Sequence, residues 1–248
     1  MKFENLASSS SGNCYWIELD RPAGEPARIM LECGLGYQEI LMRLQRQRLD
    51  ISKLDAVVVT HNHKDHSQAA ADLARRGFRV YGNSTVCSSP LTQCEAGVKK
   101  AIAPGTFVIP FLVEHDAPEP FGYIITTDKE CLLFVTDCKF WKADLSGIAF
   151  DYVIIEANYD GETMHFAIDN AKENNDLKMQ AAYKRILKAH MSIKNSIESL
   201  KKLNLSQCKA IFLIHLSDRH SRGLEFKYKT FEAVKIQTFI CKKDGGII

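Results

Sequence analysis

A short apolar run that ends in a cluster of histidines constrains this chain more than any other stretch. Residues 56–59 (Ala-Val-Val-Val) are typical of a strand buried on both faces. The run is followed at once by His61, His63, Asp65 and His66. Because alternate residues of an extended segment point the same way, His61 and His63 can reach one metal ion together. Asp65 and His66 come where the chain turns into a helix and can face a second ion. The stretch therefore predicts a metal site rather than a solvated polar turn.

Several later apolar runs also lead into ionisable residues. Strands are predicted at residues 131–135, 152–155 and 210–214, followed by Asp137, Glu156 and His215, and His115 lies at a polar corner between runs 105–112 and 121–125. In α/β sheets, chemistry gathers at the ends of strands. These four side chains are therefore candidates to work with the first cluster.

The remaining pattern predicts one α/β domain over residues 1–248. Further strands are predicted at 3–7, 14–19, 27–31, 77–82 and 237–241, and helices at 37–49, 69–76, 179–190, 192–203 and 224–234. Residues 160–180 are polar and poor in large aliphatic side chains, so we expect an exposed or mobile insertion there.

Composition narrows the class of protein. A hydrophobic content of 46% with 25% charged residues is that of an ordinary soluble globular protein. No apolar run approaches the roughly 18 residues of a membrane span, and the first residues do not resemble a signal peptide, so a cytoplasmic location is expected. The eight cysteines form no C-x-x-C pair, and reduced, mostly buried thiols are expected. A net charge of +2 permits binding to a polyanion but falls short of a dedicated nucleic-acid module.

The order of the ligand-type residues resembles that of the metallo-β-lactamase superfamily over nearly the whole chain. The resemblance implies an α/β fold, a four-layer αββα sandwich, with two divalent metal ions at one edge. It further implies that His61, His63 and His115 hold one ion, that Asp65, His66 and His215 hold the other, and that Asp137 bridges them. Imidazole and carboxylate ligands without thiolate suit Zn²⁺, Mn²⁺ or Fe²⁺.

Narrower motifs resemble those of the bacterial WalJ/YycJ group of exonucleases, which is related to ribonuclease Z. These motifs are residues 6–13 (Leu-Ala-Ser-Ser-Ser-Ser-Gly-Asn), 115–123 and 215–217 (His-Leu-Ser). Glu156 and His190 fall where ribonuclease Z-like enzymes keep a Glu–His pair that assists the leaving group. A protonated His190, oriented by Glu156, could donate that proton. The alternative is a histidine that only packs at a helix end.

Substrate contacts are predicted in two places. Ser10, Ser11 and Asn13 belong to a Gly-containing loop between strands that can position a phosphate, although a plain hairpin loop gives the same sequence. Arg219 is a candidate for contact with a nucleic-acid backbone. Further candidates are the basic residues Arg43, Arg46, Lys184, Arg185 and Lys188.

Three residues do not follow the pattern of the family. Glu32 precedes Gly34 at a distance where an Asp is usual, which leaves its role beside the metal ligands open. His220 takes the place of a usual Asn after His-Leu-Ser, and a surface histidine is the expected reading, with a contact to substrate or the metal edge as the alternative. His165 has no motif around it.

The predicted function is that of a two-metal-dependent phosphodiester hydrolase, an exonuclease that acts on DNA rather than RNA, with Asp65 orienting the attacking water or accepting its proton. The alternative is a small-molecule metallohydrolase that acts on a cyclic phosphodiester, thioester, lactone or β-lactam. A binding protein that retains the site without catalysis is a third reading. Neither a protein partner nor a membrane is indicated.

Overall fold

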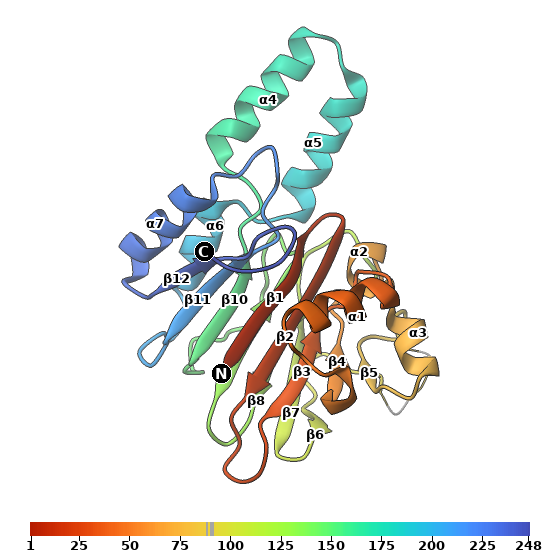
Figure 1. Ribbon diagram of the computed structural model, residues 1–248. Coiled ribbons are helices and arrows are strands. Elements are labelled where there is room, and N and C mark those ends of the chain that lie inside the picture. Colours follow the sequence, from red (N-terminus) through yellow and green to blue (C-terminus); the bar gives the residue numbers. More distant parts are fainter. Residues whose placement is uncertain (88, 90–91) are drawn as a thin grey trace.

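The structure is a computed structural model that describes residues 1–87, 89 and 92–248 (Figure 1). Its strands form two sheets. The first has the order β1-β2-β3-β4-β5 and consists of β1 (Lys2–Ser9), β2 (Gly12–Leu19), β3 (Ala27–Leu31), β4 (Ala56–Val58) and β5 (Val80–Tyr81). The second has the order β12-β11-β10-β9-β8-β7-β6 and consists of β6 (Lys100–Ala103), β7 (Thr106–Leu112), β8 (Phe121–Thr126), β9 (Cys131–Val135), β10 (Tyr152–Glu156), β11 (Ala210–Ile214) and β12 (Thr238–Ile240).

Helices lie along the outer faces of these sheets and at one end of the molecule (Figure 1). They are α1 (Tyr37–Arg46), α2 (Lys64–Ser67), α3 (Ala70–Arg75), α4 (Gly161–Glu173), α5 (Leu177–Ala189), α6 (Ile193–Leu200) and α7 (Gly223–Val234), with a 3₁₀ turn at Ile51–Lys53. Helices α1 and α3 pack on the first sheet, and α6 and α7 pack on the second. The predicted four-layer αββα sandwich is confirmed.

The apolar runs are continuous because each central strand is buried on both faces. In β2, Tyr15 and Ile17 belong to the core between the sheets, whereas Trp16 packs under α1 with Met30 and Ile40. The second sheet follows the same pattern. Along β10, successive residues pack alternately in the core between the sheets and in the core under α6 and α7. Three apolar layers therefore hold four layers of secondary structure together.

The parallel strands set the position of the chemistry. Strands β3, β4 and β5 are parallel in the first sheet, and β9 to β12 are parallel in the second. The connections after β4, β9, β10 and β11 begin at the same edge of the sandwich, next to the corner between β7 and β8. The residues that follow these strands therefore meet across the two sheets.

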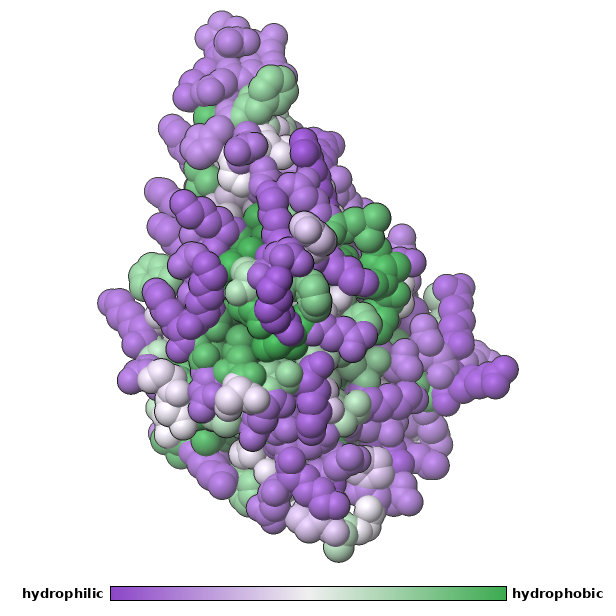
Figure 2. All heavy atoms as spheres, turned by 90° about the vertical axis from the view of Figure 1, so that its left-hand side faces the viewer, coloured by the Kyte–Doolittle hydropathy of each residue, from purple (hydrophilic) through white to green (hydrophobic). Residues whose placement is uncertain are grey.

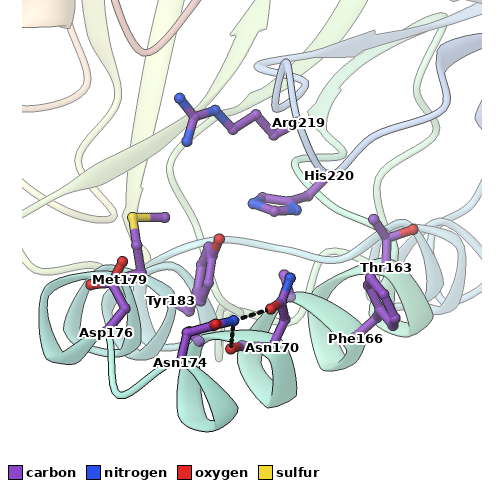
Figure 3. Close-up of a pocket in the computed structure, with 11 residues that line it drawn as sticks. Thr163, Phe166, Asn170, Asn174, Asp176, Met179, Tyr183, Arg219 and His220 are labelled. Carbon is purple, nitrogen blue, oxygen red and sulfur yellow. Dashed lines mark hydrogen bonds between the residues drawn. The ribbon is translucent and has the colours of Figure 1, made fainter.

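Residues 160–180, expected as an exposed or mobile insertion, are mostly exposed and are helical over most of their length. The segment forms most of a helical hairpin, α4 and α5, that projects beyond the sheets (Figure 1). Asp160 and Asp176 cap the two helices by accepting hydrogen bonds from backbone N–H groups of their first turns. A small core of Tyr159, Met164, Ala171 and Tyr183 joins the helices, and a cavity of about 420 Å³ lies beside it (Figure 3).

Other departures from the predicted elements are small. The strand predicted at 77–82 is reduced to Val80–Tyr81, since Gly77 adopts a φ of 90° that ends the preceding helix rather than extending a strand. Strand β6 was not predicted, because its four residues carry no clear alternation. All eight cysteines have free thiols, as expected.

The face seen in Figure 2 carries an apolar patch ringed by hydrophilic side chains. On this side of the molecule α7 exposes Leu224, Tyr228 and Phe231, and a groove between α6 and α7 is lined in part by Ile193 and Ile197. Among the residues that the structure describes, there is no helix with the length and apolar character needed to cross a membrane.

Candidate metal centre

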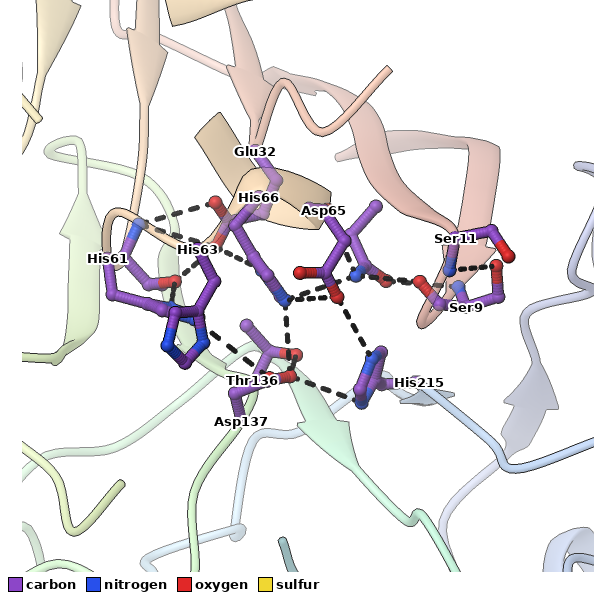
Figure 4. Close-up of polar contacts among 12 residues, drawn as sticks. Ser9, Ser11, Glu32, His61, His63, Asp65, His66, Thr136, Asp137 and His215 are labelled. Carbon is purple, nitrogen blue, oxygen red and sulfur yellow. Dashed lines mark hydrogen bonds and ion pairs between the residues drawn. The ribbon is translucent and has the colours of Figure 1, made fainter. Parts of the chain in front are cut away.

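Residues that follow β4, β9 and β11, together with His115 at the β7–β8 corner, form two adjoining groups of ligand-type side chains, most of which are drawn in Figure 4. One group consists of His61, His63, His115 and Asp137, and the other of Asp65, His66, Asp137 and His215. Within each group the potential ligand atoms lie within 4.8 Å of one another. The members are those of the two predicted ligand sets, and Asp137 belongs to both.

Individual distances show how Asp137 joins the groups. Its Oδ2 lies 3.5 Å from His115 Nε2 and 4.0 Å from His61 Nε2. Its Oδ1 lies 3.3 Å from His66 Nε2 and 3.1 Å from His215 Nδ1. One carboxylate thus turns one oxygen toward each group, which is the arrangement required of a bridging ligand.

The backbone at the strand ends is strained. Glu32, Asp137 and His215 follow β3, β9 and β11, and they adopt φ values of 60°, 43° and 53°. A non-glycine residue in this left-handed region costs on the order of 1 kcal/mol or more. Such strain persists where the surrounding structure holds it. Here it turns the chain sharply at the end of each strand, so that the side chain faces the centre.

Most of the histidines are held in place through their second ring nitrogen. Nδ1 of His61 lies 2.9 Å from Thr60 Oγ1, and Nδ1 of His115 lies 2.9 Å from the carbonyl oxygen of Ala189. Nδ1 of His215 lies 2.9 Å from Glu156 Oε1. Partners of this kind fix the orientation and tautomer of a metal-binding imidazole.

Glu32 has this supporting position for His66. Its carboxylate is fully buried, with Oε1 3.5 Å from His66 Nδ1 and 2.5 Å from Thr60 Oγ1. The extra methylene relative to Asp does not remove it from the centre. Gly34 allows the backbone that follows Glu32 to lie against the backbone of Asp65, because a Cβ at residue 34 would lie 1.7 Å from the carbonyl oxygen of Asp65.

The donor set fits divalent metal ions. The Nε2 atoms of His61 and His215 are buried and have no hydrogen-bond partner within the described part of the chain. Glu32, Asp65 and Asp137 concentrate negative charge around them, and buried carboxylates require a compensating cation. Burial opposes protonation of His66, but the Asp137 and Glu32 carboxylates raise its pKa well above the usual value. Imidazole nitrogens and carboxylate oxygens without thiolate match Zn²⁺, Mn²⁺ or Fe²⁺.

The predicted Glu–His pair lies beside these groups. Glu156 Oε1 lies 2.6 Å from His190 Nδ1 and 2.9 Å from His215 Nδ1. Cys138 N and Met191 N donate to the other oxygen of the same buried carboxylate. Burial opposes protonation of His190, yet the neighbouring Glu156 and Asp137 carboxylates raise its pKa to about 9. These carboxylates therefore favour the protonated form of His190.

The predicted substrate residues occupy different positions. Ser10 and Arg219 line a cavity of about 220 Å³ together with His190 and His215. Ser11 is exposed at the tip of the β1–β2 turn, outside that lining. Asn13 is fully buried.

The structure does not support a substrate contact by Asn13. Its Nδ2 atom lies 3.3 Å from the carbonyl oxygen of Asp65 and 3.2 Å from His66 Nε2. The Ser-rich turn places the Asn13 carboxamide beside the Asp65 backbone and the His66 Nε2 atom, and the side chain has no exposed surface to offer a phosphate. We assign Asn13 to the support of Asp65 and His66.

Some of the other basic residues predicted to contact nucleic acid pair within the protein, and the rest are exposed. Arg43 donates to the carbonyl oxygen of Leu6 and to Glu39, so its guanidinium holds α1 against β1. Arg185 pairs with Asp116 at 2.6 Å, directly beside His115. Arg46, Lys184 and Lys188 are exposed.

Two histidines outside the centre can now be placed. The expectation of a surface position for His220 is wrong: 7% of the residue is exposed, and its ring packs edge-on against Tyr183. The hairpin that covers His220 could not be foreseen from a polar sequence. His165 is exposed on α4, where its Nδ1 lies 2.7 Å from the carbonyl oxygen of Gly161.

Several supporting residues were not predicted. Thr60 contacts His61 and Glu32, and Asn158 donates to the carbonyl oxygen of His215 at 2.8 Å. The position of each gave a signal, since Thr60 precedes His61 and Asn158 follows shortly after Glu156. The Ala189 carbonyl has no such signal, because any residue supplies one.

Comparison with known proteins agrees with this geometry. The β-lactamase superfamily domain matches residues 27–216, most of the chain. The chain belongs to this superfamily. Superfamily membership, with the ligand groups above, makes the protein a metal-dependent hydrolase of the metallo-β-lactamase fold.

Two curated relatives and one solved structure illustrate the similarity. The exodeoxyribonuclease WalJ of Streptococcus pneumoniae is 28% identical over 237 residues, covering 89% of this chain and 83% of WalJ. The exodeoxyribonuclease YycJ of Bacillus anthracis is 24% identical over 238 residues, covering 84% and 88%. The short form of human tRNase Z superposes with a TM-score of 0.59 at 16% identity, covering 88% of this chain and 94% of tRNase Z. The resemblance read from the sequence motifs is confirmed.

Proposed function

We propose that this protein is a two-metal-dependent exonuclease that hydrolyses phosphodiester bonds of DNA. The observation that carries the proposal is the Glu156–His190 contact of 2.6 Å beside the two ligand groups. A protonated imidazole at this position can donate to the alkoxide that leaves when a phosphodiester bond is cleaved. The exodeoxyribonuclease names of two relatives that match most of the chain support DNA as substrate.

The ligand assignment is part of the proposal. His61, His63 and His115 would hold one ion, and Asp65, His66 and His215 would hold the other, with Asp137 between them. Two divalent ions bound there would supply an activated water and neutralise charge on the phosphoryl oxygens. The chain's own part is to orient these ligands through Thr60, Glu32, Glu156 and the Ala189 carbonyl.

Asp65 and His190 divide the proton transfers between them. Asp65 is partly exposed at the centre, with Oδ2 3.4 Å from His66 Nε2 and 3.9 Å from His215 Nε2, so it can accept a proton from the attacking water. His190 donates Nδ1–H to Glu156, which leaves its Nε2–H for the departing 3′ or 5′ oxygen. Both groups are held by charge-assisted contacts, which keeps their geometry fixed.

Ser10 and Arg219 complete the site for the strand. Both line the cavity that also contains His190 and His215, and both are exposed. The Arg219 guanidinium can pair with a phosphate next to the scissile one, and the Ser10 hydroxyl can donate to a phosphoryl oxygen. We assign to Ser10 and Arg219 the positioning of the sugar-phosphate backbone of DNA.

The test is an assay of the metal-loaded protein on end-labelled single- and double-stranded DNA and RNA, with bis-p-nitrophenyl phosphate alongside. We expect stepwise shortening of DNA that requires Mn²⁺ or Zn²⁺ and is absent in Asp137→Ala. Turnover of a thioester, lactone or β-lactam without cleavage of any phosphodiester would refute the proposal. Cleavage of RNA in preference to DNA would change the substrate and leave the mechanism in place.

A further inference from the structure

A second cavity adjoins the candidate metal centre. It lies between α4, α5 and the loop that follows His215, and it has a volume of about 420 Å³, within the range of small-molecule sites (Figure 3). Arg219 lines this cavity and also the smaller one that contains His190 and His215. A chain of nucleotides that reaches the metal ligands would therefore pass Arg219 at the mouth of the second cavity.

The walls of this cavity offer flat apolar surface and amide groups together. Phe166 of α4 and Tyr183 of α5 supply aromatic rings, and Met179 lies beside Tyr183 (Figure 3). On α4 and just after it, Asn174 Nδ2 donates to Asn170 Oδ1 at 2.5 Å. That bond leaves the Asn170 Nδ2 group as a donor and the Asn174 Oδ1 atom as an acceptor. Aromatic faces and paired amide donors and acceptors are what planar heterocycles require.

A residue with an unpaired polar atom also lines the cavity. The His220 imidazole is more than nine-tenths buried, and its Nδ1 has no hydrogen-bond partner among the residues that the structure describes. Its backbone is fixed, because Asp160 N donates to the His220 carbonyl oxygen at 2.7 Å. A buried polar atom left unpaired costs about 1–3 kcal/mol. A ligand with a polar edge in this cavity would supply the partner.

Helix α5 links this cavity to the catalytic residues. Tyr183 lines the cavity, Ile186 lines the smaller cavity one turn later, and the helix ends at Ala189, before His190. Tyr183 and His190 are seven positions apart along α5 and its C-cap, a rise of about 10 Å. The nucleotide next to the scissile phosphodiester can span that distance.

We propose that this cavity binds one unpaired nucleobase of the strand being cleaved. This inference rests on the proposed function and adds how the strand is held. The base stacks on the Phe166 and Tyr183 rings, its polar edge meets Asn170, Asn174 and His220, and Arg219 contacts the phosphate that leads to the centre. A base paired in a duplex cannot enter, so the enzyme requires a single-stranded or opened end.

The first test is equilibrium binding to the metal-loaded protein without turnover. The probes are deoxyadenosine monophosphate, which contains no phosphodiester to cleave, and deoxyribose 5-phosphate, which lacks the base. We expect the mononucleotide to bind about tenfold or more tightly, since stacking on aromatic rings favours a base. Phe166→Ala and Asn170→Ala/Asn174→Ala should abolish that difference. Equal affinity of the two probes for the wild-type protein would overturn the proposal.

The matched controls are Tyr228→Ala and Asn195→Ala. Tyr228 is 66% exposed on α7 and Phe166 is 75% exposed on α4, so each substitution removes an aromatic ring that is mostly exposed to solvent. Asn195 is likewise exposed on α6. The controls should retain the tenfold preference, and an equal loss in controls and cavity variants would refute a specific site.

A second arm uses oligonucleotides with one abasic position moved along the strand. We expect cleavage by the wild-type protein to fall about tenfold when the abasic position lies next to the scissile bond. The cavity variants should be insensitive to that position. Sensitivity that persists in both cavity variants would overturn the proposal. If the wild-type protein cleaved no nucleic acid, the proposed function would fail, whereas the mononucleotide arm would still decide whether the cavity binds a base.

Discussion

The metal centre and the α4–α5 hairpin are built in opposite ways. The centre is assembled from buried strand ends of two sheets, with strained backbone at Glu32, Asp137 and His215. The hairpin projects from those sheets, has a core of only a few residues and exposes most of its polar side chains. The ligand-type groups, which need fixed geometry, lie at the strand ends, and the hairpin reaches the centre only at the end of α5, through the Ala189 carbonyl and His190.

The largest effect is expected from removing the residue common to both ligand groups. Asp137→Ala leaves the surrounding imidazoles without their bridging carboxylate, so phosphodiester cleavage should fall on the order of 10³-fold or more. Bound metal, measured by mass spectrometry, should fall as well. Asp128→Ala, at an exposed turn, is the control that should keep both. Full activity in Asp137→Ala would contradict the assignment of the centre.

Next in size is the loss of the proton donor. His190→Ala should lower the cleavage rate of DNA by about 10²–10⁴-fold, the usual contribution of a general acid. The effect should be much smaller with bis-p-nitrophenyl phosphate, because p-nitrophenolate leaves without protonation. An equal loss with both substrates would show that His190 acts on folding or metal binding instead.

A smaller effect is expected from changing Glu32, which supports the metal ligand His66. Glu32→Gln keeps the size of a buried side chain but removes the charge that faces His66 Nδ1, so metal affinity should fall about 10–100-fold. Competition with a chelator measures this affinity. Glu4→Gln, half-buried at the start of β1, should leave this affinity unchanged. Unaltered affinity in Glu32→Gln would show that the Glu–His contact does not tune the ligand.

The pH profile should report His190. Its pKa is raised to about 9, and the protonated form is the donor, so the rate with DNA should decline as pH rises through that pKa. Bound cations offset the Asp137 charge that helps raise the pKa, which places the decline at or below pH 9. The decline should vanish in His190→Ala. A decline that persists there belongs to another group.

Stability measurements also separate the two regions. Leu213→Ala, fully buried in β11, should lower the free energy of unfolding by about 2–5 kcal/mol. Leu177→Ala, 76% exposed at the start of α5, should change it by about 0.5 kcal/mol or less. Urea unfolding measures both. A comparable loss in Leu177→Ala would mean that the hairpin is part of the rigid core.

The sequence predicted the rigid region well because burial leaves a clear pattern there. Strands buried on both faces read as uninterrupted apolar runs, and an ionisable residue at the end of such a run is conspicuous. That is how Asp137 and His215 were placed beside His61, although they lie far apart in the chain. The backbone strain at these positions left no trace in the residue types.

The hairpin was only half predicted, with α5 expected at residues 179–190 and α4 missed, for the opposite physical reason. Its helices are stabilised by capping residues and a small core, and a polar composition masks both. The same omission led us to expect His220 at the surface, since only the folded hairpin covers this residue. The contact between His115 Nδ1 and the Ala189 carbonyl was equally hidden, because a backbone acceptor does not depend on the side chain.

The hydrogen bond from His215 N to Ser8 Oγ, 2.9 Å long, joins residues 207 positions apart. Ribosomal synthesis delivers Ser8 long before His215, so the metal centre is completed only after His215 has been added. His61, His63, Asp65 and His66 are by contrast together from the outset. A metal ion bound early by this local cluster would gain its remaining ligands only later in folding. Folding that depends on contacts between residues far apart in the chain is slow.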